Sequence, residues 1–321
     1  MGELLALAAG VCFSLATMLA QRGMKEASAA AGVFVGLVFN NIIYALLLGS
    51  QIWAKGVPVV TFEGFLYAVG GGLAGNVLGR TLQFSGVRRI GSARTLSLSL
   101  TQTFFAFIFS VFLLKEMPDH LTFLGIVIIV GGVYLLTMEQ IKKEKTRTFN
   151  KVLVNSGGPT NGLEETVTTK RIPLLAPSIA GVIFALLSGL AYSVADLSRK
   201  LSLRSLPSPI LTSAIGGISA LLVHSITIGM RGGWREITGL KRQTLLFLMG
   251  SGMINGLAVV LLNTAFGYAS LVVVNSLYNI RVWVPIVLGP LILGTEARIN
   301  KIVVASTAMI LAGTLIITML K

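Results

Sequence analysis

The chain has 321 residues, only 12% of them charged, and a mean hydropathy of +0.84. Soluble domains carry about 25% charged residues, so this composition excludes a water-soluble fold of this size. The net charge of +14 does not indicate nucleic acid, because the basic residues fall mainly between apolar runs, as membrane topology requires.

Apolar runs of about 20 residues recur along the chain, and each is long enough to cross ~30 Å of hydrocarbon as a helix. The sequence therefore predicts an all-α integral membrane protein with ten spans. The predicted spans are 3–21, 31–52, 62–84, 92–114, 120–138, 174–197, 209–230, 244–266, 270–294 and 299–320. One long polar stretch, 139–173, contains IKKEKTR and NSGGPTNG and cannot bury a core. We interpret it as a linker between a first five-helix repeat, 1–138, and a second, 174–321.

The two halves resemble each other at a spacing close to 180 residues. AGVCFSLA at 9–16 corresponds to SGLAYSVA at 188–195, and LLKE at 113–116 corresponds to LGTE at 293–296. Because five is an odd number, each half starts on the opposite side of the membrane, which makes the repeats inverted. Inverted repeats are typical of alternating-access transporters.

Three segments carry a family resemblance: FLLKEMPDHLTFLGIVIIVGGVYLL at 112–136, LILGTEARINKIVVASTAMILAGTLII at 291–317 and AFGYASLVVVNSL at 265–277. They resemble the EamA-type drug/metabolite transporter superfamily. The resemblance implies a ten-helix secondary carrier of small metabolites, multi-pass in the plasma (inner) membrane. Relatives of the small multidrug-resistance type have a proton-coupling carboxylate in their first helix. That position falls on Ser14 and Ser193 here, so the resemblance does not imply proton coupling.

Arg281 is the residue inside the apolar runs that most strongly indicates a functional site. It lies about eleven residues into the ninth predicted span. A lone arginine at that depth costs a few kcal/mol unless it is paired or hydrated, so it should face the bundle interior. It either contacts an anionic substrate group, or it is a structural arginine that forms an ion pair or hydrogen bonds within the bundle. Asp196 lies at a depth that permits pairing with Arg281, as a gate, a proton-linked site or mutual neutralisation. Alternatively it is a snorkelling acid beside Arg199 and Lys200.

Polar side chains gather on the fourth and ninth predicted spans. Ser97 and Thr101 share one helix face, and so do Asn275 and Asn279. These faces either line a central pathway or hydrogen-bond helices together. The remaining candidates for the binding site are Gln102, Tyr278, Trp283 and Asn255.

Arg80 and Arg94 lie near the linker-side ends of the third and fourth predicted spans. With Arg88 and Arg89 they predict a basic cluster at one mouth of the bundle. Such a cluster either steers substrate, and so has a gating or coupling role, or sets topology by snorkelling. The loops on the linker side hold 17 Lys and Arg residues against six on the other side, which favours termini outside. The family resemblance implies the opposite orientation.

Catalytic and metal-binding motifs are absent from the sequence. It has one cysteine, two distant histidines, no phosphate-binding loop and no HExxH. We therefore expect no enzyme activity, no cofactor and no metal. The predicted function is secondary transport of a small polar metabolite across the lipid bilayer, anionic if Arg281 contacts it, without a nucleic-acid partner and with the oligomeric state open. The alternatives are a sugar-phosphate or nucleotide-sugar exchanger and a non-transporting or lipid-handling membrane protein.

Overall fold

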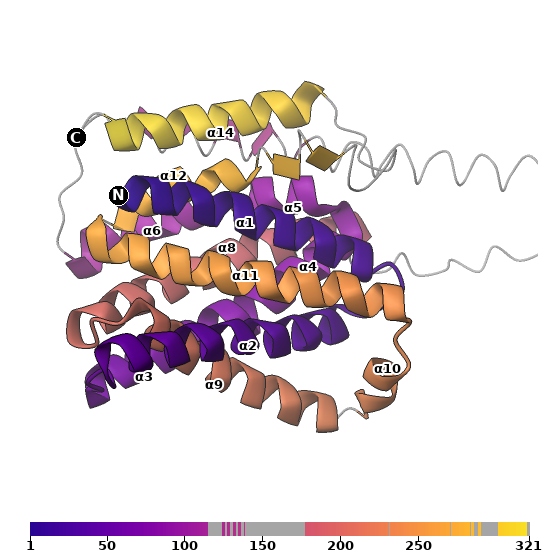
Figure 1. Cartoon of the computed structure of the whole chain (residues 1–321). Coiled ribbons are helices and arrows are strands. Elements are labelled where there is room, and N and C mark those ends of the chain that lie inside the picture. The colour runs from indigo at the N-terminus through magenta and orange to yellow at the C-terminus, as the bar shows by residue number, and fades with distance from the viewer. Residues whose placement is uncertain are drawn as a thin grey trace, which may run out of the picture.

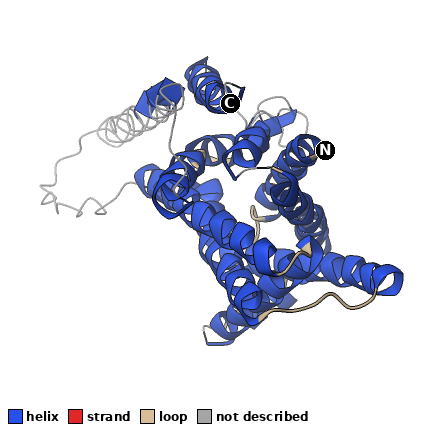
Figure 2. Cartoon of the chain, turned by 90° about the vertical axis from the view of Figure 1, so that its left-hand side faces the viewer, coloured by secondary structure: helices blue, strands red, loops and turns tan. Residues whose placement is uncertain are grey.

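The structure is a computed structural model that describes residues 1–114, 177–230, 232–269, 271–282 and 301–319, with separate residues within 124–138 and 284–289. Every regular element in these ranges is a helix (Figure 2). Six of the described helices are long and apolar enough to cross a membrane. The chain is thus an all-helical, multi-pass membrane protein. The count of ten spans stays a prediction, because most of the fifth span and the whole linker lie outside the described residues.

The first half begins with two long helices and continues with interrupted ones. Its elements are α1 (Gly2–Gly23), α2 (Ala29–Lys55), α3 (Phe62–Gly72), η1 (Leu73–Gly79), α4 (Arg80–Ile90), α5 (Ser92–Leu98) and α6 (Thr101–Leu114). Side chains set two of the starts, since Ser28 caps α2 and Thr61 caps α3 by accepting backbone N–H groups. Gly91, with φ of 85°, ends α4 in a conformation that favours glycine.

The second half also begins with two long helices. Its elements are α8 (Pro177–Ser205), α9 (Pro209–Met230), α10 (Trp234–Thr238), α11 (Arg242–Tyr268), α12 (Leu271–Tyr278), η2 (Asn279–Val282) and α14 (Lys301–Met319). The predicted seventh span coincides with α9. Two predicted ends were wrong: the third span continues beyond 84 to Ile90, and the sixth continues beyond 197 to Ser205. Both helices continue through charged residues: Arg199 is buried between helices, whereas Arg88, Arg89 and Arg204 lie exposed at the helix ends.

The halves interleave, and the most extensive packing joins one to the other (Figure 1). Helix α1 packs along α11, α2 along α9 and α11, and α8 along α3, η1 and α4. Glycines permit the closest crossing, because a Cβ on Gly72 would overlap the backbone of Gly216. Figure 1 marks the N- and C-terminal ends at the same end of the bundle.

Three membrane segments depart from regular α-helix near the middle of the bundle. The segment α3–η1–α4 contains a seven-residue π-helix, α5 and α6 are separated by a turn at Ser99 and Leu100, and α12 passes into the 3₁₀ turn η2. Such interruptions occur frequently at functional sites. They place Arg80 and Arg281 beside the cavity described next.

Candidate functional site

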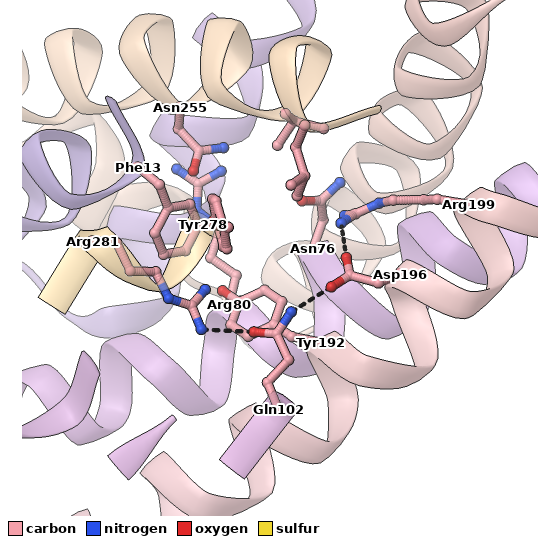
Figure 3. Close-up of a pocket in the computed structure, with 12 residues that line it drawn as sticks. Phe13, Asn76, Arg80, Gln102, Tyr192, Asp196, Arg199, Asn255, Tyr278 and Arg281 are labelled. Carbon is pink, nitrogen blue, oxygen red and sulfur yellow. Dashed lines mark hydrogen bonds and ion pairs between the residues drawn. The ribbon is translucent and has the colours of Figure 1, made fainter. Parts of the chain in front are cut away.

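A small polar cavity lies between the two halves of the chain (Figure 3). Its walls come from α1, η1, α4, α6, α8, α11, α12 and η2. The lining residues are Phe13, Asn76, Arg80, Gln102, Tyr192, Asp196, Arg199, Asn255, Val259, Leu262, Tyr278 and Arg281. The part open to the centre of a water molecule is about 10 Å³, which is room for one water. The cavity is therefore closed in this conformation.

Four of the lining residues carry charge, and all four are buried. Arg80 is 3% exposed, Arg199 6%, Arg281 1% and Asp196 1%. Three arginines against one carboxylate leave two positive charges uncompensated, since three minus one is two. Burying an uncompensated charge within a membrane is costly, so this excess of positive charge requires an explanation.

Arg281 lies in η2, where the 3₁₀ turn directs its side chain toward the cavity. Its Nη2 donates to Gln102 Oε1 at 2.7 Å, while its Nε has no hydrogen-bond partner. The guanidinium carbon lies 4.5 Å from the centre of the Tyr278 ring and 5.4 Å from that of Phe13. The two aromatic faces stabilise the cation without neutralising it.

Gln102 joins the charged groups of the two halves into one chain of contacts (Figure 3). Its Oε1 accepts from Arg281, and its Nε2 donates to Asp196 Oδ2 and, at 3.1 Å, to Asn275 Oδ1. Asp196 in turn forms an ion pair of 3.0 Å with Arg199. Of the two arrangements that the sequence left open, the structure therefore has Asp196 beside Arg199 and not paired directly with Arg281. Arg199, one helical turn beyond Asp196, takes the carboxylate, and Gln102 lies between the acid and Arg281.

Arg80 lies in the cavity wall and not in a basic cluster at the mouth, so that prediction was wrong. The reason is the length of the third span, which extends through the eleven-residue α4 to Ile90. Arg88 and Arg89 at the end of α4 are exposed. Arg94, near the start of α5, is half-buried and does not line the cavity.

Half of the predicted binding residues that the structure describes do not line the cavity and make other contacts within the bundle. Asn279 donates to Thr103 of α6 at 2.8 Å. Ser97 shares a hydrogen bond of 3.1 Å with Thr307 of α14. Thr101 donates to a backbone carbonyl of its own segment, and Asn275 binds Gln102. These groups hold the fourth, ninth and tenth spans together.

Among the remaining predicted residues, Asn255 and Tyr278 line the cavity, and Trp283 lies outside the described residues. Asn255 also donates to Asn40 Oδ1 of α2 at 3.3 Å. The structure adds Phe13, Asn76, Tyr192 and Arg199 to the candidates. Phe13 and Tyr192 were detectable as the matched aromatic pair of the repeats, and their rings touch edge to face at 6.0 Å.

The two ends of the bundle differ. At the linker-side end, the α1–α2 loop is bound to the second half: Glu26 pairs with Lys241 at 2.9 Å and accepts from Thr244 at 3.0 Å. Ser28 donates to Glu236 through its backbone N–H and its hydroxyl. We call these five residues the clasp. At the other end, an open cavity of about 710 Å³ lies between the ends of α2 and α11 and the α8–α9 turn.

Comparison with known proteins finds a similar family and similar solved structures. Residues 1–138 match the EamA-like transporter family, which confirms the resemblance predicted from the sequence. A crystal structure superposes with a TM-score of 0.63 at 14% identity, over 99% of this chain and 96% of that one. At that identity the likeness shows the fold alone, and it extends through both halves. No curated protein sequence matches the chain.

Proposed function

From the premise that the chain is a membrane transporter whose first half matches the EamA-like transporter family, we propose that it is a secondary carrier of a small anionic metabolite. The observation that carries the proposal is the uncompensated Arg281, 1% exposed in a closed cavity between the halves. An arginine in this setting is stabilised when a carboxylate or phosphate binds it, because the guanidinium presents a planar fork of donors.

Gln102 acts as a place-holder for the anion in the empty carrier. Its amide oxygen gives Arg281 a neutral acceptor at 2.7 Å, which satisfies one N–H group without cancelling the charge. An incoming anion replaces that oxygen with a charged acceptor, and hydrogen bonds to charged groups are roughly twice as strong as neutral ones. The released amide remains held by Asp196 and Asn275 through its Nε2 group.

Alternating access is the transport mechanism that the architecture favours. The interruptions at Ser99–Leu100 and at Asn279–Val282 are about 180 residues apart, which is the spacing of the proposed inverted repeats. Broken helices in corresponding positions of two repeats are typical of carrier binding sites. The clasp at one end and the open cavity at the other support an interpretation of this conformation as shut on the linker side.

Counterflow in proteoliposomes tests the proposal. Vesicles preloaded with a panel of unlabelled small organic anions should accumulate the labelled form of the transported anion. Arg281→Gln should abolish this accumulation. Arg88→Gln serves as the matched control, because it removes an exposed arginine far from the cavity contacts. Equal counterflow by Arg281→Gln would remove Arg281 from the site, and counterflow of neutral or cationic solutes alone would contradict the anion assignment.

A further inference from the structure

Arg80 is a second buried cation of the cavity without an acidic partner. Its side chain is 3% exposed, and its Nη1 has no hydrogen-bond partner. The group that faces its charge is the Phe84 ring, whose centre lies 5.3 Å from the guanidinium carbon. Within the part of the chain that the structure describes, no carboxylate forms an ion pair with Arg80.

The helices around Arg80 pack closely against its guanidinium group. A Cβ on Gly36 of α2 would lie 2.7 Å from Arg80 Nη2, so a larger residue there would force the guanidinium to move from this position. The π-helix η1 ends immediately before Arg80 and contributes Asn76 to the same cavity. Burying an arginine without a negatively charged partner destabilises a membrane protein. A ligand that supplies the negative charge offsets this loss of stability.

The charge balance of the cavity gives the number of negative charges required. Asp196 is already paired with Arg199 at 3.0 Å, so this pair is neutral as a unit. Arg80 and Arg281 remain, each with an unpartnered nitrogen buried at the cavity. Two positive charges are therefore available to a ligand, from α4 of the first half and η2 of the second (Figure 3).

We propose that the ligand of this cavity is a dianion, bound by Arg80 and Arg281 together. The proposal rests on the proposed function and narrows its substrate class. Two chemistries provide the same charge: a dicarboxylate, with one carboxylate for each arginine, and a phosphate monoester, which carries about −1.5 to −2 at neutral pH. A monoanion satisfies only one arginine and leaves the other uncompensated.

The test measures the affinity of the purified full chain for matched probes. The first set is the series of linear dicarboxylates from oxalate to adipate, each compared with its own monoamide, which has nearly the same size and one charge less. The second set compares glycerol 3-phosphate with glycerate. In the wild type, the best dianion should bind on the order of tenfold or more tighter than its monoanionic partner, because the monoanion leaves a buried charge unpaired.

Arg80→Gln should abolish the preference for two charges and retain monoanion binding at Arg281. Arg88→Gln, on the same helix, should leave the preference unchanged. Arg80→Gln should also raise the melting temperature of the ligand-free protein, since it removes an uncompensated charge, whereas loss of a purely structural arginine would lower it. The response to the two probe sets distinguishes a dicarboxylate from a phosphate ester.

The proposal is overturned if the monoamides bind the wild type as tightly as the dicarboxylates and glycerate binds as tightly as glycerol 3-phosphate. It is also overturned if Arg80→Gln keeps the preference for dianions. Monoanion binding that depends on Arg281 would leave the proposed function standing in either case. If Arg281→Gln has no effect on any anion, the proposed function fails, and the dianion proposal fails with it.

Discussion

Gln102 connects the basic and acidic parts of the cavity, and its role as place-holder has a distinctive consequence. Gln102→Leu keeps the approximate size of the side chain but removes both the acceptor for Arg281 and the donor for Asp196. Because the ligand no longer has to displace the amide oxygen, we expect tighter anion binding, by up to about tenfold. The ligand-free protein should be less stable by about 1–3 kcal/mol, since buried polar groups lose their partners.

Titration calorimetry and thermal unfolding of the same Gln102→Leu sample provide both quantities. Thr103→Val is the control, because it removes a neighbouring buried hydrogen bond to Asn279 that does not involve the arginines. It should lower stability without tightening anion binding. Weaker anion binding by Gln102→Leu would show that the amide contributes to the bound state instead of holding the site in its absence.

The sequence predicted Arg281, Gln102 and Asp196 as site residues, because polar groups inside long apolar runs are conspicuous. It placed Arg80 and Arg199 less well for one shared physical reason. Both lie where an apolar run changes to charged residues. In a sequence, the end of a membrane helix has this same pattern. Arg80 and Arg199 are 3% and 6% exposed because glycines of neighbouring helices, Gly36 and Gly75, make room for their guanidinium groups. The space for these guanidinium groups depends on how helices distant in the sequence pack against one another. A single sequence does not reveal this packing.

At the scale of elements, the clasp is a contact between the α1–α2 loop and the segment that contains α10 and the start of α11. Hydrogen bonds from Lys241 and Thr244 lower the pKa of Glu26 below its ordinary value of 4.5. A carboxyl whose pKa is lowered by a contact stabilises that contact fully above its ordinary pKa. The stabilisation is lost as the pH falls through the lowered value.

The linker-side mouth should therefore stay closed from neutral pH down to about pH 5 and should loosen as the pH falls below the ordinary pKa of the carboxyl. Spin labels at the exposed positions Ala30 and Arg235, in a Cys12→Ser background, report this as a longer distance between the labels. Glu26→Gln should have the longer distance at every pH. A pH-dependent distance that persists in Glu26→Gln would assign the effect to another group.

Element boundaries followed apolar length closely where loops are short and polar, as for α9, whose ends match the prediction. The internal interruptions were less predictable. The 3₁₀ turn η2, at Asn279–Val282, comes before the prolines of the ninth predicted span, Pro285 and Pro290. The π-helix η1 has no proline at all and lies where α3 crosses α9 through Gly72 and Gly216. These distortions arise from contacts between helices distant in the sequence.

In the whole molecule, the two halves interleave, and a positively charged cavity lies between them. The repeat resemblance, the corresponding interruptions and the contact of Phe13 with Tyr192 at matched repeat positions all favour two conformations related by exchange of roles. The chain-wide likeness to a solved structure, with a TM-score of 0.63, extends the fold beyond the half that matches the family.

The most direct test of a carrier mechanism does not require a known substrate. Cys12 is the one native cysteine, so Cys12→Ser gives a cysteine-free background in which Asn76→Cys places a thiol in the cavity wall. We expect a membrane-impermeant maleimide to label this thiol from either side of oriented vesicles, and a bound anion to slow the labelling. A thiol that reacts from one side only, or from neither, would contradict alternating access through this cavity.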